Sequence, residues 1–304
     1  MRVVVTGGTG LVGPVVLRRL LEVGDEPVVL SRDPSKARSV LPAGCQVVGW
    51  PGDAAAEAAA LEGAAGIINL AGEPIAQRWS PSVKRRLVES RVGTLGRLQA
   101  ALARCRVRPS VLVSASAVGY YGDRGDEILT EKSPAGSGFL AETCVLWEEA
   151  ARRAGELGLR TVQLRIGVVL AKEGGALARL LPIFRLGGGG PVGSGRQWMS
   201  WIHAEDLASL FVFALKEPEA SGPLNAVAPG PVTNRTFAAA LGKELRRPAF
   251  LPAPAFALSL AFGEMASVLL EGQRVLPARA MELGATFRFP GLEAALHDLL
   301  NGGS

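Results

Sequence analysis

The segment TGGTGLVG follows the apolar run RVVV and precedes a helical pattern. It places Gly7, Gly10 and Gly13 in the spacing G-x-x-G-x-x-G. In a dinucleotide-binding turn, the first glycine permits the tight bend, the second lets the backbone approach a pyrophosphate, and the third lets the helix pack closely on the strand. Free N–H groups at the helix start then hold the phosphates. The residues expected to contact the dinucleotide here are Gly7, Thr9, Gly10, Leu11, Val12 and Gly13.

Apolar runs rich in Val and Ile alternate with helical patterns over residues 1–170. The runs are continuous instead of alternating between apolar and polar residues, which is typical of parallel strands buried on both faces. This strand–helix alternation predicts an α/β fold with a doubly wound, parallel Rossmann sheet. Strands are expected at 3–7, 27–31, 46–50, 66–72, 110–116 and 161–167, and helices at 11–23, 34–41, 54–62, 80–105 and 138–158.

Beyond residue 170 the pattern loosens into segments rich in glycine and proline. We expect residues 1–170 to form the Rossmann domain and residues 171–304 to form a smaller substrate-side domain. The run PLNAVAP at 223–229 is expected to return to the large sheet as another strand, which would interleave the two domains. In the smaller domain we expect helices at 203–215, 232–245 and 291–300, and a buried apolar helix within the core-forming segment 254–270.

Charge and composition limit the kinds of ligand. The formal net charge is +5, but the 33 basic residues are scattered among 28 acidic ones. This distribution predicts no nucleic-acid surface and is compatible with a small anionic ligand. The longest apolar run is too short to span a bilayer, so no membrane contact is expected. Two histidines and three dispersed cysteines predict no metal site and no disulfide framework, and with a strand-like opening instead of a signal peptide they indicate a cytoplasmic protein.

The end of the second expected strand decides which dinucleotide binds. An NAD site places a carboxylate about 20 residues beyond the glycines to bind the ribose hydroxyls, whereas an NADP site places a cation there. Here the sequence reads LSRDPSKA, so Ser31 and Arg32 hold the decisive positions. A guanidinium can stack on adenine and bind the 2′-phosphate. The sequence therefore predicts NADP(H), with Asp33 as the counterargument because its carboxylate could bind the ribose.

Longer blocks of sequence extend over essentially the whole chain. They are GEPIAQRWS, SASAVGYYGDRG, WEEAA, LRIGVVLAKEGGAL, GGGGPVGSGRQWMSWIHAEDL, LNAVAPGPVTNRTF and LLEGQRVLPARAMELGATFRFPGLEAAL. With TGGTGLVG and NLAG, these blocks resemble the extended short-chain dehydrogenase/reductases, and more closely the atypical epimerase-family proteins sometimes labelled cell-division-inhibitor-like. The resemblance implies a Rossmann domain, a poorly characterised C-terminal domain and, as in many relatives, a homodimer formed through two long helices.

The resemblance also implies a catalytic set that this chain has only in part. In that chemistry a Ser follows the fifth strand, and a Tyr-x-x-x-Lys pair on the next helix moves the proton and holds the ribose. Ser116 fits the serine position. The next helix reads SGFLAETCVLWEEAA, where Phe139 or Leu140 replaces the Tyr. Thr143 or Cys144 replaces the Lys, so the usual proton relay is absent.

Both tyrosines of the chain lie in the loop after the fifth expected strand. Tyr121 is close to Ser116 in the sequence and near the expected nicotinamide end of the sheet, so its phenol could reach a substrate. Its ordinary pKa near ~10 would have to fall before it acted as a base at neutral pH. Ser116 and Tyr121 are the candidate catalytic residues, and the alternative is that Tyr120 and Tyr121 only line a pocket wall.

Further candidates for cofactor contacts lie on the fourth strand, the long helix and the sixth strand. They are Asn69, Leu70, Ala71, Arg91 and Arg165. Parallel sheets bind their ligands at the carboxyl ends of the strands, which favours the first three. A buried arginine on a strand needs a partner, so the alternative for Arg165 is a salt bridge to Glu142 or Glu148. The alternative for Arg91 is an ordinary exposed helix arginine.

The segment LGGGGPVGSGRQWMSWIHAED is expected to form the substrate-side loop and to lead into a helix. It offers Arg196, Gln197, Trp198, Trp201 and His203. The two tryptophans are interpreted either as lid residues or as packing at the domain seam. His203 could be a general base, but hydrogen bonding at the start of the helix is the preferred interpretation, and Glu205 and Asp206 suit the helix's first turn.

Two classes of function fit the sequence. In the first, the protein is an NADP-dependent oxidoreductase or epimerase that acts on an unidentified small-molecule substrate, while Ser116, Tyr121 or a bound water handles the proton. In the second, it is an NADP-binding sensor or partner-binding protein that has lost the chemistry. The glycine-rich loop facing the expected cleft favours the enzyme, and the missing Tyr and Lys favour the sensor.

Overall fold

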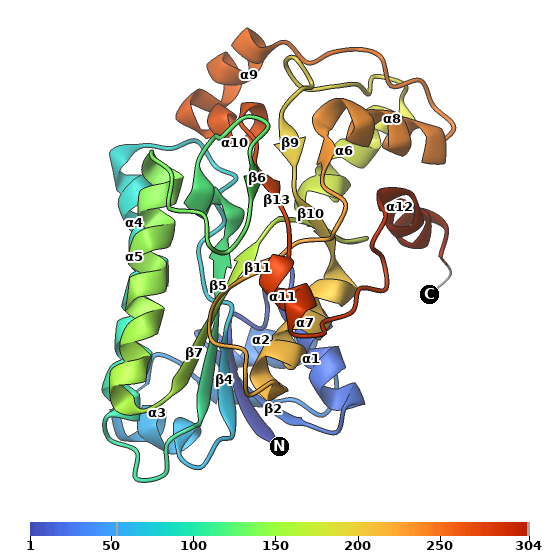
Figure 1. The fold of residues 1–304 in the computed structure, drawn as a ribbon. Coiled ribbons are helices and arrows are strands. Elements are labelled where there is room, and N and C mark those ends of the chain that lie inside the picture. The colour runs from blue at the N-terminus through green and yellow to red at the C-terminus, as the bar shows by residue number, and fades with distance from the viewer. Residues whose placement is uncertain (53, 303–304) are drawn as a thin grey trace.

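A parallel sheet forms the centre of the protein (Figure 1). The structure, a computed structural model, describes residues 1–52 and 54–302. The strands of the sheet are β1 (Arg2–Thr6), β2 (Glu26–Ser31), β3 (Gln46–Gly49), β4 (Gly66–Asn69), β5 (Val111–Ala117), β7 (Arg160–Ile166) and β11 (Gly222–Ala226). They lie in the order β11-β7-β5-β4-β1-β2-β3, and each neighbouring pair is parallel.

Helices cover both faces of this sheet, which explains why its strands are apolar throughout. The helices are α1 (Gly13–Glu22), α2 (Pro34–Val40), α3 (Ala54–Leu61), α4 (Pro81–Leu102), α5 (Phe139–Arg152) and α7 (Ala204–Lys216). Figure 1 shows α4 and α5 on one side of the sheet and α1 and α7 on the other. Val4 of β1 and Ile67 of β4 are fully buried between these layers. The doubly wound Rossmann fold expected from the sequence is confirmed.

The strand order reverses at β1. The chain runs outward from β1 to β2 and β3, and then returns through α3 to β4 on the other side of β1. Thr6 pairs with Leu30 on one side and with Asn69 on the other. In such sheets a crevice opens beyond the carboxyl ends of the strands at the reversal, and ligands bind there. The ends of β1, β2 and β4 therefore define the edge at which a dinucleotide is expected.

The boundaries of the elements differ from the expected ones by a few residues. The fourth strand ends at Asn69, before the expected 72, because the following residues turn toward the glycine-rich loop. The helix expected at 138–158 ends at Arg152 and continues as a 3₁₀ turn, η2 (Arg153–Leu157). The segment expected to return to the sheet contributes β11, which pairs in parallel with β7.

A second apolar core joins segments that are widely separated in the sequence. It is built by α6 (Gly175–Arg185), α8 (Asn234–Glu244) and α12 (Leu292–Asn301), which contribute Leu177, Phe237 and Leu296. Nearby short strands pair as β8 (Val168–Leu170) with β10 (Trp201–His203), β9 (Trp198–Met199) with β12 (Val232–Thr233), and β6 (Ile128–Leu129) with β13 (Arg274–Val275). Trp201 is fully buried in this core, and its indole N–H donates to the Gly230 carbonyl at 2.9 Å. It is therefore a packing residue and not part of a lid.

The expectation of a buried helix within 254–270 is wrong. The helix α9 (Ala255–Phe262) has no buried residue, and Phe256 and Leu260 are 77% and 78% exposed. Burial begins only after it, at Met265 in the turn η3 (Gly263–Ala266), which precedes α10 (Ser267–Leu270). The second core is already filled by α6, α8 and α12, so this segment lies outside it. Apolar composition predicts a helix but does not decide which helix fills a core.

No helix in the described ranges combines the length and apolar character needed to cross a membrane. Within the same residues, no three His, Cys, Asp or Glu side chains gather closely enough to hold a metal ion. The cysteines are free thiols, of which Cys105 and Cys144 are buried and Cys45 is half-buried.

Candidate functional site

The loop between β1 and α1 lies directly against the end of β4. Gly7 has a φ of +71°, a conformation that favours glycine. A Cβ added at Gly7 would lie 2.6 Å from the carbonyl carbon of Leu70 and 2.7 Å from the amide nitrogen of Ala71. A Cβ at Gly13 would overlap the Gly8 carbonyl group, so α1 begins packed against its own loop. Both positions therefore require glycine because of close backbone contacts.

The N-terminus of α1 is open to a ligand. Val12 caps the helix without a side-chain hydrogen bond, and no group in the described residues accepts from the N–H groups of Leu11 or Val12. Thr9 and Gly10 are exposed beside them, and a Cβ at Gly10 would meet only the Gly7 carbonyl oxygen. The helix dipole and free N–H groups favour a phosphate at such an end. These residues fit the pyrophosphate of a dinucleotide.

The residues after β2 include an exposed arginine, Arg32, and a carboxylate, Asp33, that caps the next helix. Arg32 is exposed, and within the described residues its guanidinium makes no hydrogen bond or ion pair. Asp33 caps α2, where its carboxylate accepts from the Lys36 backbone N–H at 3.0 Å. The Ser31 hydroxyl donates to the Asp33 carbonyl at 3.1 Å. The carboxylate that argued for NAD thus has a structural role in the helix cap.

Asn69 joins the ends of three strands. Its side chain is fully buried, accepts from the Thr6 hydroxyl at 2.6 Å and donates to the Ser114 hydroxyl at 3.0 Å. These bonds tie β1, β4 and β5 together at the carboxyl edge. The side chain of Asn69 thereby positions Leu70 and Ala71, whose backbone lies against the glycine-rich loop.

Arg91 anchors the loop that follows β4. Its guanidinium donates to the carbonyl oxygens of Leu87 at 2.8 Å and Glu73 at 3.1 Å. It also lies over the Trp147 ring, 4.9 Å from the ring centre. Burial lowers the pKa of Arg91, while the negative charge of Glu73 acts in the opposite direction. Arg91 is therefore a half-buried anchor of the backbone at the cofactor edge and not an ordinary exposed helix arginine.

Side chains from β5, α5 and β7 meet at the carboxyl edge. The Ser116 hydroxyl donates to Glu148 Oε1 at 2.7 Å, and Arg165 donates to both Glu148 oxygens at 2.8 Å. The side chains of Arg165 and Glu148 are 3% and 13% exposed. Burial disfavours the charged form of Arg165, but its bonds to Glu148 outweigh burial and raise its pKa. Arg165 therefore forms the salt bridge to Glu148 that was the alternative to a cofactor contact.

Tyr121 lies in the 3₁₀ turn η1 (Val118–Tyr121) and is fully buried. Its hydroxyl donates to Asn225 Oδ1 at 2.7 Å and accepts from Arg165 at 2.9 Å. Burial raises the pKa of Tyr121 to about 12, although Arg165 and Asn225 act to lower it. Tyr120 packs against the same guanidinium, 3.5 Å from its ring centre. The phenol of Tyr121 is thus enclosed in the wall around Arg165, which favours the alternative that the two tyrosines line a pocket wall.

Two residues of this network were not selected from the sequence as site residues. Asn225 donates through its side chain to the Leu276 carbonyl at 2.9 Å, and its backbone N–H donates to Glu131 at 2.9 Å. Glu148 was considered only as a partner of Arg165. A signal for Glu148 exists, since it lies four residues after Cys144 and hence on the same face of α5. No local pattern marks Asn225.

The positions on α5 that would carry Tyr and Lys have other contacts. Phe139 packs edge-on against Trp79 with ring centres 5.1 Å apart, and the Lys84 ammonium lies 5.0 Å from the Phe139 ring centre. The Thr143 hydroxyl donates to the Phe139 carbonyl at 2.7 Å. Burial raises the pKa of Cys144 to about 12. None of the four residues at these positions, Phe139, Leu140, Thr143 and Cys144, supplies a group that ionises near neutral pH.

The loop predicted to face the substrate lines a pocket of about 220 Å³. The indole N–H of Trp198 donates to Asp126 at 2.7 Å, and Arg274 lies over the same ring, 4.3 Å from its centre. The lining includes Asp123, Asp126, Ser194, Arg196, Gln197 and Trp198. Because Asp123 follows Tyr121 by two residues, this pocket is connected to the end of β5 by a short stretch of chain.

His203 caps α7, as preferred from the sequence. Its Nδ1 accepts from the Glu205 backbone N–H at 3.2 Å, and its side chain is 2% exposed. Because Nδ1 is an acceptor, the ring is neutral and its proton is on Nε2, which lies 3.5 Å from Asp298. Burial lowers the pKa of His203, although Asp298 and Asp206 act to raise it.

Acidification should destabilise the protein through His203. An unfolded histidine titrates near pH ~6.5. Below that pH the unfolded chain binds a proton that the folded chain binds more weakly, so the free energy of unfolding falls as the pH falls. We expect His203→Asn, which keeps a capping acceptor, to lose less thermal stability than the wild type between pH 7 and pH 5. The same substitution at the exposed His297 is the control, and an equal loss in all three proteins would contradict this role.

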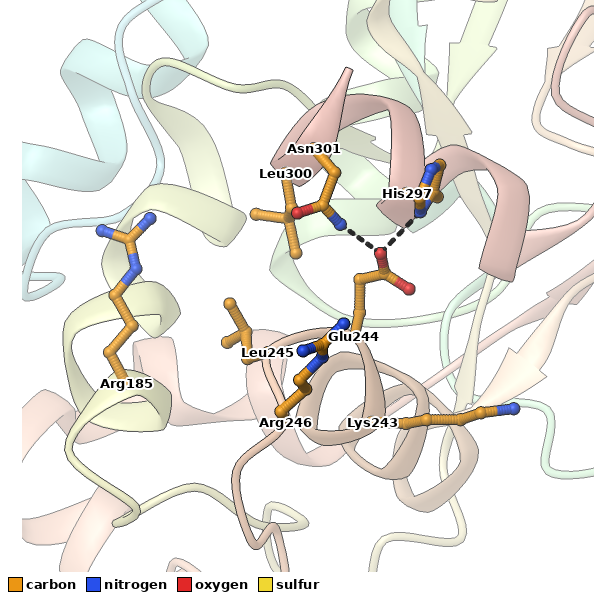
Figure 2. A pocket seen from close by; sticks show the side chains of 8 residues that line it. All are labelled: Arg185, Lys243, Glu244, Leu245, Arg246, His297, Leu300 and Asn301. Atoms are coloured by element: carbon orange, nitrogen blue, oxygen red, sulfur yellow. Dashed lines mark hydrogen bonds and ion pairs between the residues drawn. The ribbon is translucent and has the colours of Figure 1, made fainter. Parts of the chain in front are cut away.

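A larger cavity of about 610 Å³ lies where α6, α8 and α12 end (Figure 2). Arg185 stands on one side of it, and Glu244 faces His297 on the other, with His297 Nδ1 2.8 Å from the Glu244 carboxylate. Lys243 and Arg246 add basic charge. Basic residues near helix C-termini favourably oppose the helix dipole, which accounts for their presence without a ligand.

The comparisons with known proteins agree with this geometry. Residues 3–227 match the model of the NAD dependent epimerase/dehydratase family. The chain belongs to this family. Residues 253–299 match a second family, a domain of unknown function (DUF1731). The family match thus includes the glycine-rich loop, the buried network around Arg165 and β11, whereas the exposed helix α9 falls in the second match.

Relatives of this family extend over nearly the whole chain. The chloroplastic epimerase family protein SDR39U1 homolog of Arabidopsis thaliana is 42% identical over 99% of this chain and 87% of that protein. Epimerase family protein YfhF of Bacillus subtilis is 36% identical over 99% of this chain and 98% of that protein. The crystal structure of human epimerase family protein SDR39U1 with NADPH is 38% identical, has a TM-score of 0.90, and covers 98% of this chain and 99% of that one. The resemblance to atypical epimerase-family proteins is confirmed.

Proposed function

We propose that this chain binds NADP(H) across the carboxyl ends of β1, β2 and β4. The open N-terminus of α1 and the close backbone contacts at Gly7 and Gly13 support a pyrophosphate site at the glycine-rich loop. The human relative, 38% identical to this chain, was crystallised with NADPH. The adenosine half would then extend toward the end of β2, where Ser31 and Arg32 leave the sheet.

The available guanidinium of Arg32 is the observation that carries the choice of NADP(H) over NAD(H). It is exposed beside Asp33, whose carboxylate is held in the cap of α2. A guanidinium can pair with a phosphate through two hydrogen bonds. NAD(H) lacks the 2′-phosphate and would gain little from this residue.

The substitution Arg32→Ala should weaken binding of NADPH by about 10- to 100-fold. Hydrogen bonds to a charged group are worth about 1.5–3 kcal/mol, which corresponds to that range of affinity. Binding of NADH should change little, because it has no phosphate for Arg32 to contact. Isothermal titration calorimetry with each cofactor measures both effects.

Arg19→Ala is the matched control, since it removes the same charge from α1, where Arg19 pairs with Glu22 at the surface. This variant should bind both cofactors as the wild type does. Equal affinity of the wild-type protein for NADH and NADPH would contradict the assignment, and so would binding of neither.

We further propose an oxidoreductase or epimerase reaction in which Ser116 and Glu148 replace the missing Tyr and Lys. A bound nicotinamide would exchange the hydride. The chain handles the proton: Ser116 Oγ takes the proton of a substrate hydroxyl, directly or through one water, as it passes its own to Glu148 Oε1, 2.7 Å away. The reverse transfer protonates a carbonyl oxygen. Arg165 holds Glu148 in the orientation that this exchange needs.

A second function, an NADP(H)-binding sensor without turnover, is favoured by two observations. Phe139 or Leu140 and Thr143 or Cys144 occupy the positions of Tyr and Lys, and Ser116 is only 2% exposed. A panel of aldehydes and ketones offered with NADPH separates the two functions. Consumption of NADPH that depends on one carbonyl compound supports the enzyme, whereas saturable NADPH binding without consumption supports the sensor.

A further inference from the structure

The helix α9 is apolar on all sides and lies in solvent. Its sequence, AFALSLAF, contains no charged residue, and the uncharged stretch extends from Pro248 to Gly263. The chain between α8 and α9 crosses the same end of the molecule, at the top of Figure 1. The exposed apolar side chains along this path are Phe250 (72%), Leu251 (50%), Phe256 (77%), Leu260 (78%) and Phe262 (37%). A helix without a polar face is ordinarily buried, so we expect another molecule to bury this surface.

We propose that a second copy of this chain covers α9, in a two-fold symmetric homodimer in which α9 packs against α9 of the partner. An exposed Phe carries roughly 200 Å² of surface, so the five side chains together present on the order of 600 Å² of apolar area. This is at the upper limit of what monomers leave uncovered. It also approaches the roughly 800 Å² per partner of a standard interface, and the exposed alanines and prolines of the same stretch add to it.

The distribution of side chains on α9 suits a symmetric contact. Phe256 and Leu260 are four residues apart and therefore form one ridge on the helix. Ala257, Ala261 and Ser259 are small, and they leave room for the corresponding ridge of a partner helix. A two-fold interface requires that one patch complement itself, and an uncharged ridge flanked by small residues does so without like-charge repulsion.

Charge favours a second copy over a lipid surface. Helices that lie on membranes carry Lys and Arg on a polar face, which attract anionic headgroups. Here α9 has no polar face, and the charged residues that flank the uncharged stretch are Arg246 and Arg247 before it and Glu264 after it, none of them on α9 itself. Lys84 of α4, which contacts this segment, is already paired with Glu264. That pair leaves Lys84 less available to an anionic headgroup and joins the turn after α9 to α4.

This surface differs from the pair of long helices through which many relatives dimerise. On α5, the exposed apolar side chains are Val145 and Leu146, at 41% and 51%, which is far less apolar area than α9 presents. The two surfaces can therefore be tested separately, each by placing charges at two exposed apolar positions of one helix.

The test is sedimentation velocity of the full chain at about 1–50 μM. We expect the wild type to be a dimer and the variant Phe256→Asp with Leu260→Asp to dissociate at least about 100-fold more readily, since charges placed at the centre of an apolar interface abolish its main contacts. The matched control is Val145→Asp with Leu146→Asp, which should remain dimeric. Far-ultraviolet circular dichroism and NADPH binding report whether each variant is folded. Should the α9 variant not fold, Phe256→Cys and Leu260→Cys are oxidised singly, and a covalent dimer that Leu146→Cys does not form supports the proposal.

Other outcomes overturn the proposal. A wild-type protein that is monomeric over the whole range has no such dimer. A dimer that survives the charged α9 variant, or that the α5 variant dissociates, places the interface elsewhere. Flotation of monomeric wild-type protein with vesicles of phosphatidylcholine and phosphatidylglycerol, lost in the α9 variant, assigns the surface to lipid instead.

Discussion

We expect Arg165→Met to lower the free energy of unfolding by about 3–5 kcal/mol. The substitution removes a guanidinium that is 3% exposed and leaves the Glu148 carboxylate without its partner. The Tyr121 hydroxyl also loses the N–H that it accepts at 2.9 Å. An uncompensated charge away from water costs far more than the packing that methionine retains. Denaturant unfolding followed by circular dichroism measures the loss.

An exposed ion pair on α5, the helix that carries Glu148, is the matched control. Arg152 donates to both carboxylate oxygens of Glu149, at 2.7–3.0 Å, but its side chain is 65% exposed. Arg152→Met should leave stability unchanged, because water replaces such a contact. Arg165→Met combined with Glu148→Leu should recover much of the loss, since it removes both buried charges. If Arg165→Met alone were as stable as the wild type, the pair between Arg165 and Glu148 would not stabilise the fold.

Much of the fold could be predicted because it depends on local patterns. A run such as RVVV has no polar face, so it suits only a strand covered on both sides. The close backbone contacts at Gly7 and Gly13 could be predicted from their spacing. An added Cβ at either position would meet backbone atoms, so glycine is the one residue that fits. Arg32 was selected for a different reason, since the residue after the second strand lies at the ligand-binding edge in this class of sheet, and its contact with the cofactor stays a prediction.

The rest depended on contacts between residues far apart in the sequence. Tyr121 and Asn225 are 104 positions apart, and Ser116 and Glu148 are 32 apart, so no local spacing links either pair. The tyrosine was expected near a substrate because it lies close to Ser116 and near the nicotinamide end of the sheet, but the returning strand β11 supplies the amide that binds its hydroxyl. The prediction that α9 is buried was wrong for the same kind of reason. Residues of α6, α8 and α12, which are distant in the sequence, fill the second core instead.

The second large effect is expected at Ser116. With a carbonyl compound that the panel identifies as a substrate, Ser116→Ala should lower kcat by about 10²–10⁴-fold, the usual contribution of a positioned proton-transfer group. The variant should bind NADPH and unfold much as the wild type does, because Arg165 still pairs with both oxygens of Glu148. Steady-state kinetics, calorimetry and denaturant unfolding together test this combination.

Tyr121→Phe is the variant that separates the two candidate residues. Its phenol, with a pKa of about 12 and two buried partners, cannot exchange a proton readily at neutral pH, so kcat should remain within about threefold of the wild type. Stability should fall instead, by about 1–3 kcal/mol, because Asn225 and Arg165 each lose a hydrogen-bond partner in the interior. If Tyr121→Phe were stable but inactive while Ser116→Ala stayed active, the tyrosine and not the serine would be the proton-transfer residue. The opposite pattern places it on the hydroxyl at the end of β5, where the sheet presents its ligands.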